Sequence, residues 1–164
     1  MRLLKRAIFA CLLTLTSLAC AQAENWTVYG NPRFGVFAEY PADLFQPLPP
    51  PENGDGLSFR SRDGASLAIF GSNNIDGASP AAYESSLRSG GGDDYANVTY
   101  RASGAGWLVL SGLRGSDIFY EKYLFNRDLV LGMVMTYPQA LKAEYDPIAA
   151  RIAKSLSAHK VEVQ

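Results

Sequence analysis

The chain has 164 residues, of which 48% are hydrophobic and 19% are charged, with 15 Lys and Arg against 16 Asp and Glu. The basic residues are scattered, so the clustered cations that bind nucleic acid are missing and we expect no nucleic-acid partner. Without residues 1–23, which contain three basic and no acidic side chains, 12 basic residues remain against 16 acidic ones, a net charge of −4.

The first 23 residues have the pattern of a secretory signal peptide. Residues 1–6 carry three positive charges, residues 7–18 are apolar but too few to span a bilayer, and residues 21–23 form an Ala-Gln-Ala cleavage pattern. We therefore expect cleavage before Glu24 and export of the mature chain, residues 24–164, to the periplasm. No later stretch is apolar for long enough to cross a membrane, so we expect no transmembrane segment in the mature chain.

Cys20 leaves a second interpretation open. Leu18 and Cys20 resemble part of a lipobox, which would make the protein a lipoprotein anchored to the outer or inner membrane at Cys20, but Ser17 stands where that motif has Leu. The Ala-Gln-Ala pattern explains the region better. Both cysteines, Cys11 and Cys20, lie in the predicted signal, so the mature domain is expected to be cysteine-free, without disulfides or thiolate chemistry.

The mature chain has the length of one ordinary domain with its own core. Its first predicted strands are residues 26–30 and 34–40, with turn residues at Asn31-Pro32 between them. Residues 42–56 are expected to form a loop, whose run of prolines favours a stiff, extended surface connection over a docking segment.

A β-hairpin and a helix are predicted next. The stretch 57–70 has two β-prone halves around Asp63-Gly64, a pair that supplies the positive φ angles of a type I′ turn. Ser79 and Pro80 are the residue types of a helix N-cap and a first helical position, and the three glycines at 90–92 end that helix.

The middle of the chain predicts an antiparallel meander. Three β-prone runs follow a further strand at residues 96–102, and only the polar pairs Gly115-Ser116 and Arg127-Asp128 separate them. If both pairs are tight turns, the register places Glu121 between two apolar neighbours and opposes Arg114 to Asp117, an opposite-charge pair. The runs are residues 106–114, 117–126 and 129–136.

Two glycines of this meander are predicted to lie under aromatic rings, which cover the backbone that a glycine leaves bare. The predicted pairs are Gly112 with Phe119, Gly132 with Tyr123, Leu110 and Val134 with Glu121, and Leu108 with Tyr123.

Alternation sorts the meander into two mainly apolar faces. One carries Trp107, Val109, Leu113, Ile118, Tyr120, Leu124, Leu131, Met133 and Met135. The other carries Leu108, Leu110, Gly112, Phe119, Glu121, Tyr123, Phe125, Val130, Gly132 and Val134. Because both faces are apolar, we expect helices on both sides, which is an α+β fold with an antiparallel sheet sandwiched by helices.

A C-terminal helix is the natural cover for the first face. Its apolar residues recur at spacings of four, three, four and four, which is one helical stripe. At Asp146-Pro147 the helix either kinks or gives way to a second helix capped by Asp146. The stripe is Leu141, Tyr145, Ile148, Ile152 and Leu156.

Glu121 is the candidate site residue, because a charge in mid-strand among large apolar neighbours needs a partner, a pocket or exposure. In a functional interpretation it lines a ligand or partner groove with Tyr123, Phe119 and Arg114. In a structural interpretation Glu121 reaches an Arg on the covering layer. The adjacent Lys122, which points to the opposite face, would then extend past its neighbours to water.

Other chemistry finds little support in the sequence. The one histidine, His159, lies in the C-terminal tail, and the mature chain has no cysteine, so Ser-His-Asp, Cys-His and zinc sites are improbable. Neither a Gly-x-Ser-x-Gly elbow nor a phosphate loop occurs. We expect no catalytic residue, no metal site and no cofactor.

The order of features resembles the PsbP-like superfamily, which includes extrinsic photosystem proteins, a Ran-binding import factor family and DcrB-type bacterial envelope proteins. The stretches that carry it are residues 34–41, the strands within 107–138 and the end of the last helix at 152–156. Residues 24–164 are also similar to a branch of uncharacterised exported bacterial proteins with the same Tyr-Pro opening. The resemblance implies a PsbP-like α/β/α domain and carries over no catalytic residue, since the superfamily shares no active site.

These observations predict an exported periplasmic accessory or binding protein without catalytic activity. Its partner would be another envelope protein or a small ligand. The alternatives are a small periplasmic hydrolase or ligand-binding enzyme that uses Glu121, and the lipoprotein anchored at Cys20.

Overall fold

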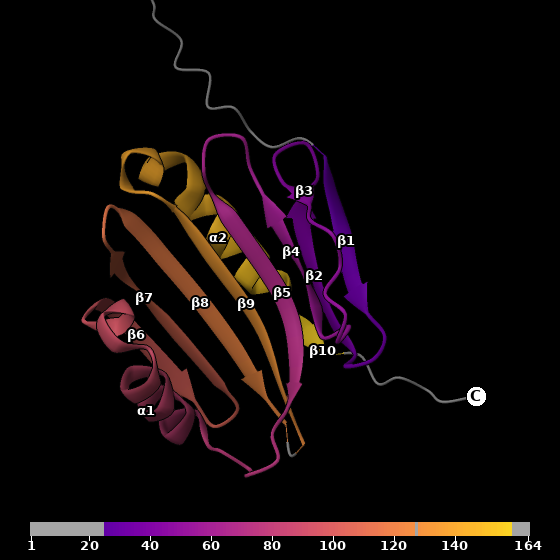
Figure 1. The fold of residues 1–164 in the computed structure, drawn as a ribbon, viewed down its shortest axis with the longest axis vertical. Coiled ribbons are helices and arrows are strands. Elements are labelled where there is room, and N and C mark those ends of the chain that lie inside the picture. The colour runs from indigo at the N-terminus through magenta and orange to yellow at the C-terminus, as the bar shows by residue number, and fades with distance from the viewer. Residues whose placement is uncertain (1–24, 127, 159–164) are drawn as a thin grey trace, which may run out of the picture.

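The computed structural model describes residues 25–126 and 128–158. The predicted signal peptide with both cysteines, Arg127 of the second turn and His159 lie outside these residues. The described chain folds into two antiparallel sheets, two α-helices and two short 3-10 helices (Figure 1).

Seven strands form the larger sheet, in the order β3-β4-β5-β9-β8-β7-β6, and all neighbours are antiparallel. Three of them are the predicted meander, which places β9 in the centre of the sheet. The strands are β3 (Gln46–Pro47), β4 (Gly56–Arg60), β5 (Ser66–Asn73), β6 (Asn97–Gly104), β7 (Trp107–Arg114), β8 (Asp117–Phe125) and β9 (Leu129–Pro138).

The smaller sheet joins the two ends of the described chain. It contains β1 (Trp26–Asn31), β2 (Val36–Pro41) and β10 (Ser157–Ala158) in the order β1-β2-β10. Since β10 follows the last helix directly, pairing of β10 with β2 ties that helix to the first strands of the fold.

Both predicted helices form. In α1 (Pro80–Gly90), the Ser79 hydroxyl accepts a hydrogen bond from the Ala82 N–H at 3.2 Å, as expected of an N-cap. The α2 helix (Lys142–Ser155) continues through Pro147, so Asp146 does not cap a second helix. The 3-10 helices are η1 (Gly92–Tyr95) and η2 (Gln139–Leu141).

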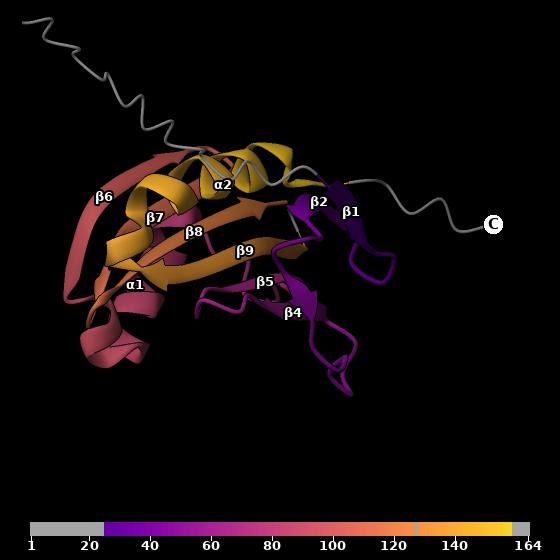
Figure 2. The same cartoon turned by 90° about the horizontal axis from the view of Figure 1, so that it is seen from above.

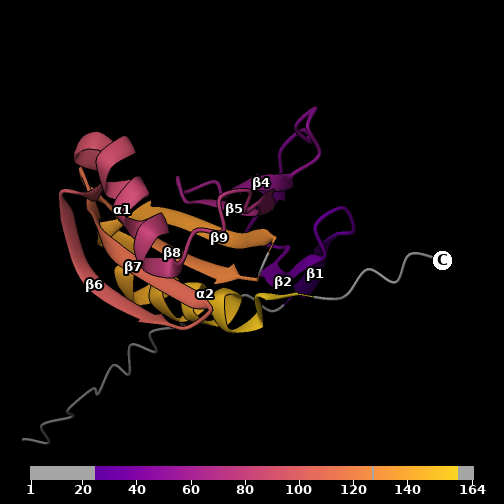
Figure 3. The ribbon, with the colours of Figure 1, turned by 90° about the horizontal axis from the view of Figure 1, so that it is seen from below.

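The two α-helices lie on opposite sides of the larger sheet (Figure 2). The predicted stripe of α2 packs with Leu131, Met133 and Met135 of β9 in the main core, as the alternation indicates. On the other face lies α1 (Figure 3). Its Tyr83 and Leu87 pack over a second, smaller cluster. The buried members of that cluster are Leu108, Leu110, Phe119, Tyr123 and Val130.

The predicted register of the meander is confirmed at every pair. Glu121 pairs with Leu110 and Val134, and Arg114 pairs with Asp117 across a two-residue turn. In that turn only Gly115 has a positive φ, of 63°, which is typical of a type II′ turn.

Three side-chain details of this region differ from the expectation. Arg114 forms its ion pairs with other carboxylates than Asp117, because its long side chain extends along the sheet. The ring nearest to Gly132 is that of Phe70 on β5, since β5 also pairs with β9 there. Trp107 is 39% exposed, because α2 packs mainly over β8, β9 and β2 and leaves the end of β7 open.

The hairpin turn at Asp63-Gly64 is not type I′, because only Gly64 has a positive φ. The connection is a three-residue loop, closed by a backbone hydrogen bond from the Ser61 N–H to the Ala65 carbonyl at 2.9 Å. The Ser61 hydroxyl accepts from the Ala65 N–H at 2.8 Å and donates to the Asp63 carboxylate, which favours the longer loop.

The fold is therefore mixed α+β, as predicted, with antiparallel sheets that dominate over two helices.

Substitution of Gly112 by Ala tests the close packing that positions the site. A Cβ at Gly112 would come within 2.1 Å of the Asn97 carbonyl oxygen and 2.9 Å of the Phe119 ring. Because the first neighbour is backbone, we expect Gly112→Ala to lower the free energy of unfolding by about 3 kcal/mol in urea titration. Gly90→Ala is the control, since a Cβ there meets nothing within 4 Å; an equal loss in both variants would contradict the prediction.

Candidate functional site

The structure brings the four predicted site residues together on the α1 face of the sheet. Glu121 of β8 is only 1% exposed. Its Oε2 accepts hydrogen bonds from the hydroxyl of Tyr123 at 2.8 Å and from the hydroxyl of Tyr95 at 3.0 Å. Its Oε1 accepts from Nη2 of Arg114 at 3.3 Å.

Arg114 lies at the end of β7, on the same face as Glu121, because alternate residues of neighbouring strands share a face. Its guanidinium carbon lies 4.9 Å from the centre of the Phe119 ring, a cation–π distance. Its buried Nε lies 3.3 Å from the Asp94 carboxylate. The two groups form an ion pair, but their geometry is not that of a hydrogen bond. Arg114 thus links the buried carboxylate to an exposed one.

Tyr95 belongs to η1, which covers the sheet here, and sequence reasoning missed it. It follows Asp93-Asp94 in a polar, glycine-rich segment that the sequence indicates to be a flexible loop. A large aromatic residue in such a polar segment was the sequence signal that could have indicated a buried contact. Its ring packs edge-on against Phe119 with centroids 5.8 Å apart, so Tyr95 closes the cluster from above.

The tyrosines keep their protons and act as donors. Burial, together with the neighbouring Glu121 charge, raises the pKa of Tyr95 to about 12. The same two causes raise the pKa of Tyr123 still further, and they also raise the pKa of Tyr83, which packs against Tyr123. Protonated phenols that surround a carboxylate form a satisfied hydrogen-bond network.

This arrangement is a closed polar cluster. A general acid or base must reach the atom that gains or loses a proton, and both oxygens of Glu121 are already engaged under a covering layer. In the described residues, no group of three or more His, Cys, Asp and Glu side chains could hold a metal ion. A ligand-binding role for Glu121, Tyr123, Phe119 and Arg114 stays a prediction.

Lys122 is partly exposed, and it also has a partner on α2 that the sequence did not indicate. Its Nζ donates a hydrogen bond of 2.5 Å to the carbonyl oxygen of Ala153 in the last turn of α2. A cation is favourable at that end, where carbonyl groups lack helical partners. Burial lowers the pKa of Lys122. The two neighbouring charged residues thus lie on opposite faces of the sheet. Glu121 bonds to η1 on one face, and Lys122 bonds to α2 on the other.

A second buried carboxylate, Glu84 of α1, was also missed. It forms ion pairs with Nε of Arg88 at 3.1 Å and with Nε of Arg101 on β6 at 2.5 Å. The spacing of four residues between Glu84 and Arg88 was the sequence signal for the first pair. The pair with Arg101 ties α1 to the outer strand of the sheet.

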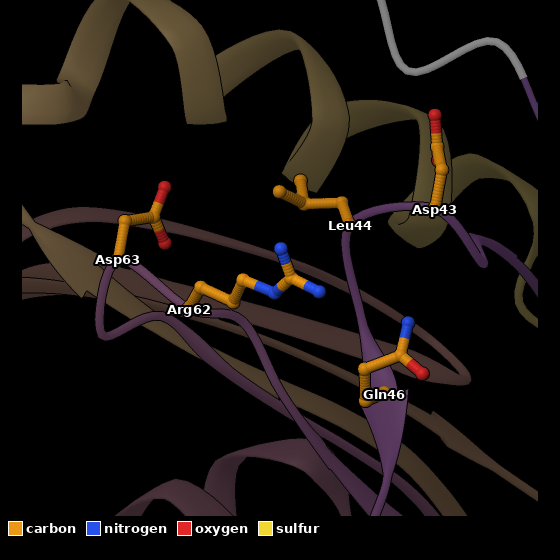
Figure 4. Close-up of a pocket in the computed structure, with 5 residues that line it drawn as sticks. All are labelled: Asp43, Leu44, Gln46, Arg62 and Asp63. Carbon is orange, nitrogen blue, oxygen red and sulfur yellow. The ribbon is translucent and has the colours of Figure 1, made fainter.

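A small pocket lies elsewhere, where the β4–β5 hairpin meets the segment after β2 (Figure 4). It has a volume of about 210 Å³, and the Arg62 guanidinium extends between the other lining side chains. Burial acts to raise the pKa of Asp63, but hydrogen bonds from Ser61 and Tyr145 outweigh it and lower the pKa. The lining residues are Asp43, Leu44, Gln46, Arg62 and Asp63.

The fold that carries these sites is PsbP-like. Fourteen chains of solved structures match it. One is the solution structure of cyanobacterial PsbP (CyanoP) from Synechocystis sp. PCC 6803, with a TM-score of 0.62 and 12% sequence identity over 82% of this chain and 93% of that chain. At this identity the similarity establishes the fold alone.

No protein-family model matches the chain, and no curated protein matches its sequence. None of the helices in residues 25–126 and 128–158 is long and apolar enough to cross a membrane.

Glu121→Gln tests whether the cluster stabilises the fold. Glutamine has one acceptor oxygen where the carboxylate has two, and its amide N–H groups would face the hydroxyl or guanidinium donors around it. The substitution also leaves Arg114 without its buried counter-charge. We expect the free energy of unfolding to fall by about 3 kcal/mol, as measured by urea titration.

Asp94→Asn is the matched control, because it removes the exposed carboxylate that forms an ion pair with the same Arg114 guanidinium. A surface pair contributes less than about 1 kcal/mol, so this loss should be smaller. Equal stability of Glu121→Gln and the native chain would refute a structural role for the carboxylate.

Alkaline pH should destabilise the protein through its buried tyrosines. A raised pKa stabilises the folded state below the ordinary phenol pKa of about 10, and this stabilisation is lost as the pH rises toward the folded value of about 12 for Tyr95. We expect the free energy of unfolding to fall between pH 10 and 12, and less steeply in Tyr95→Phe. If Tyr95→Phe and the native chain share one slope, Tyr95 is not held protonated.

Proposed function

We propose that the protein is an exported periplasmic accessory or binding protein without catalytic activity. The leader at residues 1–23 supports export, and the PsbP-like domain at residues 24–164 supports a role in binding, because this fold comes with no shared active site. We place the chain in the exported bacterial branch of the PsbP-like superfamily.

The observation that carries the proposal is the closure of Glu121. Its carboxylate is the one charged group that the central strands bury on the α1 face, and Tyr95, Tyr123 and Arg114 occupy both its oxygens. A hydrolase would need this carboxylate beside an opening and a second group with a suitable pKa. The cluster supports the structural interpretation of Glu121 over the enzymatic alternative.

In this proposal the domain is an α/β/α sandwich, with α2 and α1 as outer layers on the two faces of the larger sheet. The partner is another envelope protein or a small ligand. The pocket beside Arg62 supports a small polar ligand, since a guanidinium, an amide and two carboxylates line it.

Expression of the full chain in a bacterium, with a C-terminal tag, tests the proposal. We expect the protein in the periplasmic fraction with the intact mass of a chain that begins at Glu24, and we expect an envelope protein or a small molecule to co-purify with it. A diacylated N-terminus at Cys20 would establish the lipoprotein alternative instead.

A panel of ester, peptide and glycoside substrates covers the enzymatic alternative. We expect no turnover by the native protein. Turnover that Glu121→Gln abolishes, at an unchanged free energy of unfolding, would establish the enzyme and overturn the proposal.

A further inference from the structure

The larger sheet has one closed edge and one open edge. At the closed edge, β3 has only two residues, and Pro47 has no backbone N–H to offer another strand. At the open edge, β6 has eight residues, no Pro and one charged side chain, Arg101, which forms an ion pair with Glu84 of α1. A register shift between Val98 and Tyr100 disturbs its beginning and leaves the stretch to Gly104 regular. Figure 2 shows β6 along the outer rim of the sheet.

Two exposed aromatic side chains lie beside this edge. Tyr100 of β6 is 54% exposed and Trp107 of β7 is 39% exposed. They share the α2 face, because Tyr100 pairs with Ser111 and Trp107 pairs with Gly104. The indole covers Gly104, where a Cβ would lie 2.3 Å from its Nε1. Large aromatic rings that stay exposed next to an unpaired strand mark an interaction surface.

We propose that this edge joins a second copy of the chain, through antiparallel pairing of β6 with β6 of the other copy. A two-fold axis through Ala102 opposes Ala102 to itself and Tyr100 to Gly104. Opposed residues of an antiparallel pair share a face, so the Tyr100 ring of each copy meets Trp107 of the other beside Gly104. The contact between Tyr100 and Trp107 then covers both exposed aromatic side chains. The two-fold symmetry produces this contact twice.

This register is more favourable than those with the axis at Arg101 or Tyr100. With the axis at Ala102, Arg101 opposes Ser103, whose hydroxyl can accept from the guanidinium. With the axis at Arg101, two guanidinium groups would face each other, which is unfavourable. With the axis at Tyr100, the register shift near Val98 would interrupt the pairing. The ion pair between Arg101 and the buried Glu84 further balances the charge at this edge.

The result is a continuous sheet through two copies, with the closed β3 edges at its far ends. One strand pair and two aromatic contacts make an interface smaller than the roughly 1,600 Å² of a standard complex. We therefore expect a dimer that forms with rising concentration. The inference goes beyond the proposed function and does not depend on it, since it uses neither Glu121 nor the leader.

Sedimentation velocity over a concentration series of the purified mature protein tests the association. We expect a monomer–dimer equilibrium that Tyr100→Ser and Trp107→Ser each weaken by at least about tenfold, because each removes a central aromatic contact. Val28→Ser and Ile75→Ser are the controls, since both are apolar residues exposed elsewhere, on β1 and in a loop. A native protein that stays monomeric at every concentration overturns the proposal, and so does a dimer that Tyr100→Ser and Trp107→Ser leave unchanged.

A cysteine at the axis tests the register. Ala102→Cys places two thiols on one face of the strand pair, within disulfide reach, so oxidation should give a covalent dimer in non-reducing electrophoresis. Val28→Cys on β1 should give no covalent dimer. The same is expected of Arg101→Cys, which points to the other face beside Ser103 of the second copy. Equal cross-linking of all three variants, or none in Ala102→Cys, contradicts this register. A different protein that takes the β6 edge in place of a second copy would also overturn it.

Discussion

The carboxylate of Glu121 is the interaction on which the α1 face of the fold depends. A charge removed from water must be matched by donors, and here the donors come from three different elements: Tyr123 on the same strand, Arg114 on β7 and Tyr95 on η1. Because Tyr95 belongs to the covering segment, the same contact that satisfies the charge also holds that segment against the sheet. The cluster thus satisfies the buried charge of Glu121 and also positions η1 over the sheet.

The α2 face meets its requirements differently. Its core is apolar, and polar contacts occur at both ends of the helix rather than under its middle. The hydroxyl of Tyr145 donates to Asp63 at 2.6 Å near the start of α2, and Lys122 donates to Ala153 near its end. Hydrogen bonds are directional, so these contacts fix the position of α2 along the sheet more closely than apolar packing alone. They also leave the β6–β7 end of this face uncovered, which is where Tyr100 and Trp107 remain exposed.

Where sequence reasoning succeeded, the signal was local or repeated. The register of the meander followed from Gly115-Ser116 and from alternation, and the stripe of α2 followed from its spacing. It failed where a single side-chain contact decided the outcome. Ser61 favours a three-residue loop over a type I′ turn, and Lys122 donates to a carbonyl of α2. Such contacts depend on where a distant backbone lies, which periodicity does not encode.

The sequence by itself determined the mixed α+β class, the register of the meander and its two apolar faces, because these depend on spacing between near neighbours in the chain. It also singled out Glu121 as a charge in need of a partner. Only the tertiary structure decided which partners it has. Tyr95 is 26 residues away from Glu121, and its hydroxyl reaches the carboxylate because η1 packs over the sheet. Contacts between layers are set by how the layers pack, and that packing is a property of the whole fold.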